Sequence, residues 1–225
     1  MTHLYKNYLI CRDDYFDNPD NVIAISNNLE FHKSTYFPGR RTGNLLAMED
    51  PEIKKFADWF ADRVSYDVFP GISRYEIYVC FHINDVYKDK RFNAGWIHAD
   101  YGNLAGLVYL TPDEDNLNTG TSIFSGKGAD LSTCDELPSD AEARLKFYLD
   151  ENVTPEFVEG FERNRKLLEN SETIRIGNKF NRLIAYDSKM WHRPNSMSTE
   201  TGTPRLTLLF FISQFNYNQQ TISTV

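Results

Sequence analysis

The 225-residue sequence is poor in cysteine, carries no excess of positive charge and contains no long uninterrupted run of apolar residues. Its three cysteines, Cys11, Cys80 and Cys134, are an odd number without CxxC spacing, which indicates neither a disulfide framework nor a zinc finger. The formal net charge is -8, so we expect no nucleic-acid partner and no membrane partner. No segment is long and apolar enough to cross a bilayer, and the N-terminal residues lack the pattern of a signal peptide. These absences predict a soluble protein in a reducing compartment, the cytoplasm.

The sequence also lacks internal repeats, low-complexity tracts and linkers rich in Pro, Gly or Ser, so we expect residues 1–225 to form a single domain. Hydrophobic residues make up 41% of the chain, which is enough for one full core. Phe (16), Tyr (13) and Trp (3) are abundant and favour a β-rich interior. Residues from about 125 to 170 have helical and loop sequence, and we predict that they form a helical insertion.

Two segments carry the signals of helices. One begins at Asp50-Pro51 and continues to about residue 65, with apolar residues at helical spacing. The other begins at Thr154-Pro155, inside the predicted insertion.

Several other segments alternate as strands do. In residues 73–85, Val79 and Phe81 fall on one face and Cys80 and His82 on the other. Further strands are expected at residues 94–101, 104–111, 120–124, 172–178, 182–187 and 205–213. The last is so apolar that we expect it to be covered on both faces. The first 46 residues, with the apolar run 22–25 and a turn at 37–39, predict additional strands and loops. This order favours antiparallel sheets and a mainly β fold of the α+β class.

The chemistry of the chain is suggested by a His-x-Asp pair, His98 and Asp100, and by His192 far downstream. Residues two apart on a strand point the same way and can hold one ion. Two imidazoles and one carboxylate are the set that binds non-haem Fe(II) and leaves its other face open. Each part has a plainer explanation: the pair alone is a weak motif, and His192 alone could be a packed loop residue.

Arg205 adds a second signal, because it stands at the head of the apolar strand 205–213. A buried guanidinium without a partner is costly, so this position predicts an anionic partner. The carboxylate of an acidic cosubstrate would suit its fork of N–H donors. Thr207 lies two residues further on the same side of the strand and offers a hydroxyl.

These elements, in this order and spacing, resemble the Fe(II)/2-oxoglutarate-dependent dioxygenase superfamily, and most closely its prolyl-4-hydroxylase-like branch, over roughly residues 75 to 213. The resemblance implies a double-stranded β-helix, a cupin-like jelly roll, with supporting helices. It implies that His98, Asp100 and His192 bind Fe(II), and that Arg205 and Thr207 bind the distal carboxylate of 2-oxoglutarate. It further implies that oxygen is consumed and that succinate and CO2 are released. The usual product of the family is a hydroxylated substrate.

The chain departs from the prolyl hydroxylases in two places. Arg205 replaces the lysine that many of them use for the distal carboxylate, and Thr119-Gly120-Thr121 replaces a pair of glycines. These departures argue against prolyl specificity without affecting the metal site.

Among the aromatic residues, Tyr109 is the strongest candidate for a contact with the cosubstrate, because it lies on the strand that follows the His-x-Asp pair. Tyr78 and Tyr101 are weaker candidates, and ordinary packing with a satisfied hydroxyl would account for any of them. Trp96 and Trp191 flank the proposed ligands and suit either a cavity wall or the core. The insertion at 125–170 would either cover the site or support it.

We therefore predict an oxygenase that hydroxylates an amino acid side chain, a peptide or a small metabolite. One alternative is a cupin-like metalloenzyme in which zinc or another divalent ion activates water and Arg205 binds an anionic substrate. The other is a non-catalytic jelly-roll module. Exposed edge strands would also allow a homodimer.

Overall fold

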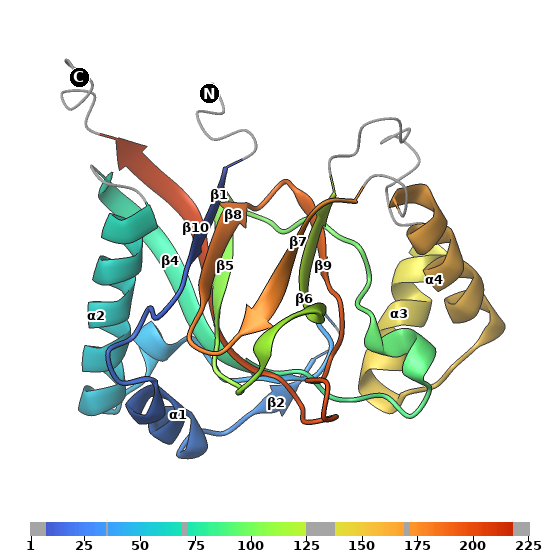
Figure 1. The fold of residues 1–225 in the computed structure, drawn as a ribbon, viewed down its shortest axis with the longest axis horizontal. Helices are drawn as coiled ribbons and strands as arrows, with labels where there is room; N and C mark the ends of the chain where they lie inside the picture. Colours follow the sequence, from blue (N-terminus) through green and yellow to red (C-terminus); the bar gives the residue numbers. More distant parts are fainter. Residues whose placement is uncertain (1–7, 35, 69–71, 125–137, 169–171, 218–225) are drawn as a thin grey trace.

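A computed structural model describes residues 8–34, 36–68, 72–124, 138–168 and 172–217 (Figure 1). In chain order the elements are β1 (Leu9–Arg12), α1 (Pro19–Asn27), β2 (His32–Lys33), β3 (Arg40–Arg41), η1 (Leu45–Ala47), α2 (Pro51–Val68), β4 (Ile72–Ile83), η2 (Lys90–Asn93), β5 (Leu104–Tyr109), β6 (Glu114–Phe124), α3 (Pro138–Asp150), α4 (Pro155–Leu168), β7 (Glu172–Lys179), β8 (Leu183–Asp187), β9 (Trp191–Pro194) and β10 (Leu206–Tyr217). No helix within these ranges is long and apolar enough to span a membrane.

The strands form two antiparallel sheets that face each other (Figure 1). The larger sheet has the order β1-β8-β5-β10-β4-β3-β2, and the smaller has the order β7-β6-β9. An isolated antiparallel bridge between His98 and His192 extends the smaller sheet beyond β9. From β4 onward the chain crosses repeatedly between the sheets. Strands β4, β5, β8 and β10 belong to the larger sheet, and the bridge at His98, β6, β7 and β9 belong to the smaller sheet. This is the path of a jelly roll, and it confirms the predicted fold class.

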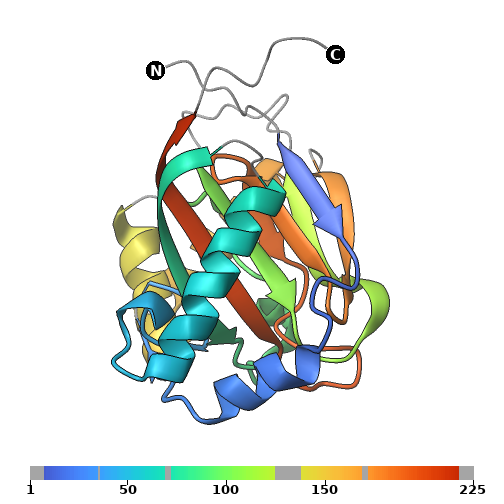
Figure 2. The same cartoon turned by 90° about the vertical axis from the view of Figure 1, so that its left-hand side faces the viewer.

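Alternation along the strands divides the larger sheet into an outer and an inner face. On the outer face, Val79 of β4 and Phe210 of β10 pack against Phe60 of α2, and all three side chains are fully buried. Helix α2 lies across these strands (Figure 2). On the inner face, Cys80 and Leu209 pack between the two sheets. Strand β10 is thus covered on both sides, as its sequence predicted.

Helices α3 and α4 lie against the other side of the molecule (Figure 1). Their aromatic residues form a separate buried cluster with the segment that precedes His98. Phe147 and Phe157 stack with ring centroids 4.1 Å apart, and Phe157 lies 4.9 Å from Phe92. Trp96 belongs to this cluster, so it packs in a core.

Two expectations need correction. Residues 22–25 lie in helix α1, because Asn18 caps the helix, Pro19 begins it, and Val22 and Ser26 are buried at helical rather than strand spacing. The strand expected at residues 94–101 is reduced to the bridge at His98. His192, for which a packed loop position was the plainer alternative, lies on the short strand β9. The other predicted strands and both predicted helices are present.

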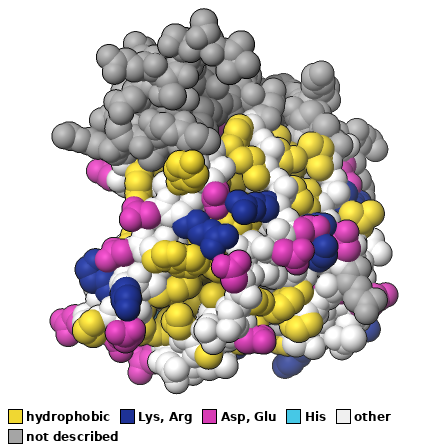
Figure 3. Space-filling model, turned by 60° about the vertical axis from the view of Figure 1, so that its left-hand side comes forward, with side chains coloured by type: hydrophobic (Ala, Val, Ile, Leu, Met, Phe, Trp, Pro, Cys, Tyr) yellow, Lys and Arg dark blue, Asp and Glu magenta, His cyan; other side chains and the backbone are white. Residues whose placement is uncertain are grey.

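The molecular surface carries both signs of charge. On the face shown in Figure 3, acidic and basic side chains are interspersed among apolar ones. The large negative net charge is therefore not gathered into one acidic patch on that face.

Candidate active site

His98, Asp100 and His192 come together between the sheets, although 91 residues lie between Asp100 and His192 in the sequence. One ligand atom of each residue lies within 4.8 Å of the other two. The Nε2 atom of His192 lies 3.3 Å from Oδ2 of Asp100, and Nε2 of His98 lies 3.7 Å from Oδ1. The sequence thus identified three side chains that the fold brings to one point.

Backbone pairing positions the two imidazoles. The amide of His98 donates to the carbonyl of His192 at 3.0 Å, and the amide of His192 donates to that of His98 at 2.8 Å. The two residues are therefore direct cross-strand neighbours, and their ring centroids are 4.4 Å apart. The amide of Asp100 donates to the carbonyl of Ser188 at 2.8 Å, which holds the carboxylate beside them.

The hydrogen bonds also decide which ring nitrogen of each histidine can bind a metal. Nδ1 of His98 lies 2.9 Å from the carbonyl oxygen of Trp96, and Nδ1 of His192 lies 2.9 Å from that of Met190. A carbonyl oxygen only accepts, so in both rings Nδ1 carries the hydrogen. The lone pair of the neutral ring is then on Nε2, which faces Asp100. Such outer hydrogen bonds typically orient metal-binding histidines.

The charges of the three groups are strongly coupled. Burial raises the pKa of Asp100, but His192, His98 and the more distant Arg41 outweigh it and lower the pKa to about 2. Burial lowers the pKa of His192, but Asp100 reverses this and raises it. Enclosure and repulsion from His192 lower the pKa of His98 to about 4, although its side chain is 46% exposed and hydration offsets part of this effect. Asp100 is therefore ionised at neutral pH.

This donor set fits a divalent transition metal. Two ligands about 2.1 Å from an ion and at right angles to each other are about 3 Å apart. The observed nitrogen-to-oxygen separations of 3.3 and 3.7 Å need only small side-chain movements to reach that value. Two neutral imidazoles and one carboxylate suit Fe(II) and similar ions.

Arg205 lies at the start of β10 with 2% of its surface exposed. Its Nη1 donates to the backbone oxygens of Thr119, Gly120 and Ser196, which hold one end of the guanidinium. Its Nε is buried and has no hydrogen-bond partner. Burial lowers the pKa of Arg205, yet so basic a group stays charged. The sequence predicted that Arg205 is buried and needs an anionic partner, and the structure shows that Arg205 is buried.

Tyr109 connects Arg205 with the histidine cluster. The guanidinium carbon of Arg205 lies 5.3 Å from the ring centroid of Tyr109, whose hydroxyl is 2.7 Å from Oγ1 of Thr121. Thr121 lies on β6 two positions from Ile123, which pairs directly with His192. Arg205, Tyr109 and His192 therefore line the same space between the sheets.

The remaining predicted site residues differ in their placement. Thr207 faces the same interior, is 1% exposed, and donates a long 3.4 Å hydrogen bond to the backbone oxygen of His82. Tyr78 is 39% exposed and its ring centroid is 6.3 Å from that of Phe211. Tyr101 is 93% exposed, so it lies at the surface beside the site. Trp191 is partly buried on β9.

Sequence reasoning missed Arg41, which comes from the two-residue strand β3. Arg41 pairs with His82 of β4, and its guanidinium carbon lies 4.0 Å above the ring centroid of Phe37. Its charge acts on Asp100, Tyr78 and Cys80. The only signal in the sequence was an arginine that follows the turn at residues 37–39, and so short a strand has no recognisable alternation.

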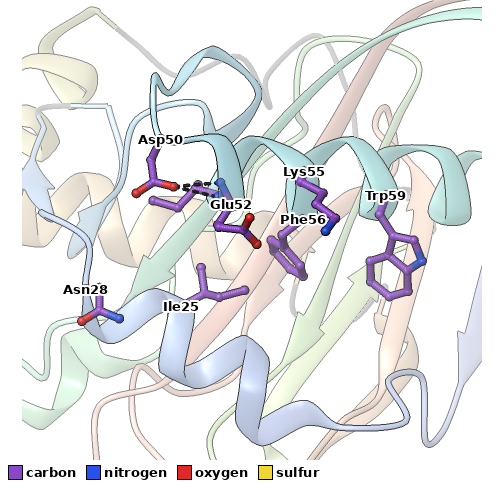
Figure 4. Close-up of a pocket in the computed structure, with 8 residues that line it drawn as sticks. Ile25, Asn28, Asp50, Glu52, Lys55, Phe56 and Trp59 are labelled. Atoms are coloured by element: carbon purple, nitrogen blue, oxygen red, sulfur yellow. Dashed lines mark hydrogen bonds between the residues drawn. The ribbon is translucent and has the colours of Figure 1, made fainter.

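A hollow lies on the outer side of the larger sheet, between α1 and the first turns of α2. It encloses about 500 Å³. Figure 4 shows Ile25 from α1 and Phe56 and Trp59 from α2 along its walls. Asp50, at its edge, accepts hydrogen bonds from the amides of Glu52 and residue 53 and so caps α2. This hollow is lined mainly by apolar side chains and lies apart from the histidine cluster.

Searches with the sequence find no matching family model and no matching curated protein. Solved structures with a similar fold do exist. The chain is similar to a prolyl hydroxylase from Trichoplax adhaerens in complex with a peptide fragment of hypoxia inducible factor, with 10% identity and a TM-score of 0.48 over 96% of this chain and 87% of that one. It is also similar to HygX from Streptomyces hygroscopicus with nickel, 2-oxoglutarate and hygromycin B bound, with 13% identity and a TM-score of 0.49 over 90% and 82%.

A prolyl-4-hydroxylase from Pseudomonas putida gives 10% identity and a TM-score of 0.44 over 92% of both chains. Likenesses at this level leave the reaction and the substrate to be decided by the side chains of the site.

Proposed function

We propose that this chain is a single-domain Fe(II)- and 2-oxoglutarate-dependent oxygenase that hydroxylates an amino acid side chain, a peptide or a small metabolite. In this proposal His98, Asp100 and His192 hold the iron through Nε2, a carboxylate oxygen and Nε2. Arg205, Tyr109 and Thr207 bind the distal carboxylate of 2-oxoglutarate.

The placement of Arg205 carries this proposal. A metal-binding triad alone suits many reactions, but here a buried guanidinium with an unsatisfied Nε lines the same interior as the triad. Nη1 is already held by backbone carbonyls, so the edge that contains Nε is available to a carboxylate. A dicarboxylate that reaches from the triad to Arg205 would bind the metal with one end and accept a hydrogen bond from Nε of Arg205 with the other.

The protein groups bind and orient. Asp100 is ionised at neutral pH and contributes the negative charge that a divalent ion needs. The Nδ1 hydrogen bonds of His98 and His192 fix both rings, and the burial of Arg205 strengthens its attraction for an anion by excluding water. When bound, iron and 2-oxoglutarate would supply the oxidising power: the keto acid is oxidised to succinate and CO2, and an oxygen atom from O2 enters the substrate.

The acidic surface and the free thiols of Cys11 and Cys80 are compatible with action in the cytoplasm on a small molecule or peptide. The proposal requires no second copy of the chain, since every group named above comes from one chain.

The direct test is an anaerobic titration of the metal-free protein with Fe(II) and 2-oxoglutarate, followed through the visible charge-transfer band of the chelated keto acid. We expect the wild type to give the band and His192→Ala to lose it, because a ligand is removed. Arg205→Ala should weaken the affinity for 2-oxoglutarate at least tenfold while Fe(II) still binds, because a charge-assisted pair is worth about 1.5–3 kcal/mol. His32→Ala, a change of an exposed histidine, is the matched control.

Two results would overturn the proposal. If Fe(II) binds but no band appears at any concentration of 2-oxoglutarate, the chain uses its metal for other chemistry. If the wild type binds no divalent ion, as measured by equilibrium dialysis, it is a binding module without a metal.

A further inference from the structure

We propose that Arg41 binds a carboxylate of the substrate that is oxidised, and that this enzyme therefore acts on an acidic molecule or on an acidic residue of a peptide. The inference rests on the proposed function for the identity of the reaction. It assigns to the site a second anion-binding residue, separate from Arg205.

The pairing of β3 with β4 places Arg41 inside the barrel. Arg41 lies opposite His82, and directly opposed residues share a face of the sheet. His82 and Cys80 are buried on the inner face. Arg40, one position earlier, points the other way and pairs at the surface with Asp85, its Nε being 3.2 Å from the carboxylate.

The surroundings of Pro38 and Gly39 fix this short strand. Gly39 has φ +77°, and a Cβ at this position would lie 2.1 Å from the backbone oxygen of Ile83. Only glycine therefore allows the turn to approach β4 so closely. Nε2 of His82 lies 2.5 Å from the carbonyl oxygen of Pro38 and ties the turn to the inner face. These contacts fix the position of the turn that precedes Arg41.

The guanidinium of Arg41 lies against aromatic rings and, among the described residues, has no acidic partner. It lies 4.0 Å from the ring centroid of Phe37 and 5.7 Å from that of Phe211. Its Nε is buried without a hydrogen bond, and among residues 8–217 that the structure describes no carboxylate lies within ion-pair distance of it. The Arg41 side chain as a whole is partly exposed, but its Nε is buried and unsatisfied. Leaving such a charged donor without an acceptor is unfavourable, so this arrangement indicates a ligand.

Asp100 does not take that place. Its two oxygens face Nε2 of His98 and Nε2 of His192, the atoms with which it would share a metal. Arg41 lies opposite His82, and His82 lies opposite Thr207 of β10, so an anion on Arg41 would lie in the same interior as the site. Tyr78, two positions before Cys80 on β4, is 39% exposed.

The two arginines serve different ligands because they lie on different strands. Arg205 immediately precedes β10 and lies over Tyr109 of β5, whereas Arg41 lies on β3, with β4 between it and β10. A bound cosubstrate that occupies Arg205 leaves Arg41 for a second acidic molecule. The Nε–H of Arg41 has no hydrogen-bond partner, and a planar carboxylate matches the N–H edge of a guanidinium.

The test uses N-acetylglycine as the carboxylate probe and N-acetylglycinamide as its uncharged counterpart. Thermal unfolding is followed anaerobically in protein saturated with Fe(II) and 2-oxoglutarate, so that Arg205 is already occupied. We expect N-acetylglycine to raise the Tm of the wild type by about 3 °C at tenfold excess over its Kd, and the amide to have no effect. Arg41→Gln should abolish the shift, and Arg40→Gln, the matched control from the outer face, should retain it.

A second measurement separates Arg41 from the cosubstrate. The Kd of 2-oxoglutarate, taken from the charge-transfer band, should rise at least tenfold in Arg205→Gln and less than twofold in Arg41→Gln. Arg41→Lys keeps the charge but loses the planar fork, so it should weaken the probe about tenfold, and it carries the test if the glutamine variant fails to fold.

Several results would overturn the inference: no shift in the wild type, an equal shift in Arg41→Gln, a shift with inorganic phosphate but not with N-acetylglycine, or an Arg41→Gln effect on 2-oxoglutarate as large as that of Arg205→Gln. Thermal unfolding of metal-free Arg205→Gln protein with N-acetylglycine measures binding of the probe to Arg41 directly. A shift there without any charge-transfer band in the wild type would refute the oxygenase and retain the anion site.

Discussion

Three histidines lie near the interior, and they differ in which ring nitrogen contacts a backbone carbonyl oxygen. His98 and His192 each give Nδ1–H to the carbonyl two residues earlier, and this leaves Nε2 free to bind. His82 instead has its Nε2 2.5 Å from the carbonyl of Pro38, so that nitrogen carries the hydrogen. His82 is therefore a structural donor, and burial together with the nearby Arg41 holds its pKa well below 6.5.

A pH dependence of stability follows from His82. Between pH 6.5 and 5 the unfolded chain takes up a proton at this residue and the folded chain does not, so the free energy of unfolding falls as the pH falls. The loss is about 1.4 kcal/mol per pH unit at most, or about 2 kcal/mol at pH 5. Urea unfolding of the wild type and of His82→Gln at pH 7 and pH 5 measures it, since glutamine does not titrate. Equal pH dependence in the two proteins would show that His82 is protonated in the fold.

The candidate site residues that stand on or next to recognisable strands were predicted from the sequence. His98 and Asp100 stand together, and the length of the apolar strand made Arg205 conspicuous, so their meeting with His192 follows from the order of strands. Arg41 could not be found in this way. Its position depends on Gly39 and on a pairing of two residues that no periodicity announces.

Among the elements, strands were predicted better than their connections. The alternation of β4 and the apolar length of β10 depend only on burial by a sheet, and both were predicted. Helix α1 was missed because its nine residues are too few to separate helical from strand spacing. Helices α3 and α4 lie within the predicted insertion, of which residues 125–137 and 169–171 fall outside the described ranges. The packing of these helices depends on aromatic contacts with residues 87–97 that have no local signature.

Helix α4 supports the segment that carries His98 through one side chain. The amide of Ile97 donates to Oδ1 of Asn164 at 2.9 Å, and Nδ2 of Asn164 donates to the carbonyl of Ile97 at 2.8 Å. Asn164 thus pairs with the residue next to His98 much as a neighbouring strand would. Through this contact the insertion would act on the position of His98.

Asn164→Leu should therefore weaken metal binding without touching the metal. It keeps a similar volume but leaves both polar groups of Ile97 unpaired, so we expect about a tenfold loss of Fe(II) affinity in a chelator competition assay. Glu162→Leu, on the exposed side of the same helix, is the control. Unchanged affinity in Asn164→Leu would mean that the strand holds His98 without help from α4.

At the scale of the whole molecule, the end of the barrel away from the metal cluster is closed by Arg182. Its side chain is 10% exposed and donates to Asp13, which follows β1, to Asp115 on β6 and to the backbone oxygen of Gly177 on β7. One residue thereby joins the edge of the larger sheet to the smaller sheet. This hydrogen bonding lowers the pKa of Asp13 to about 2.

Arg182→Gln should consequently lower global stability and spare the site. The variant loses charge-assisted hydrogen bonds to Asp115 and Asp13, and Asp13 keeps only its pair with Lys179, so we expect a loss of about 2 kcal/mol in urea unfolding at pH 7. Because the pKa of Asp13 is lowered in the fold, the pairing stabilises above about pH 4, and the difference between wild type and variant should shrink as the pH falls towards 2. Its size is limited by the 37% exposure of Asp13.

The control is Arg175→Gln, which breaks a more exposed pair with Glu172 and should cost less than about 0.5 kcal/mol. Fe(II) affinity should be the same in both variants and in the wild type, in contrast to Asn164→Leu. If Arg182→Gln is no less stable than Arg175→Gln, the two sheets are held together by the apolar interior alone. If it loses metal affinity as well, the two ends of the barrel are coupled, and the site depends on the closure of the whole fold.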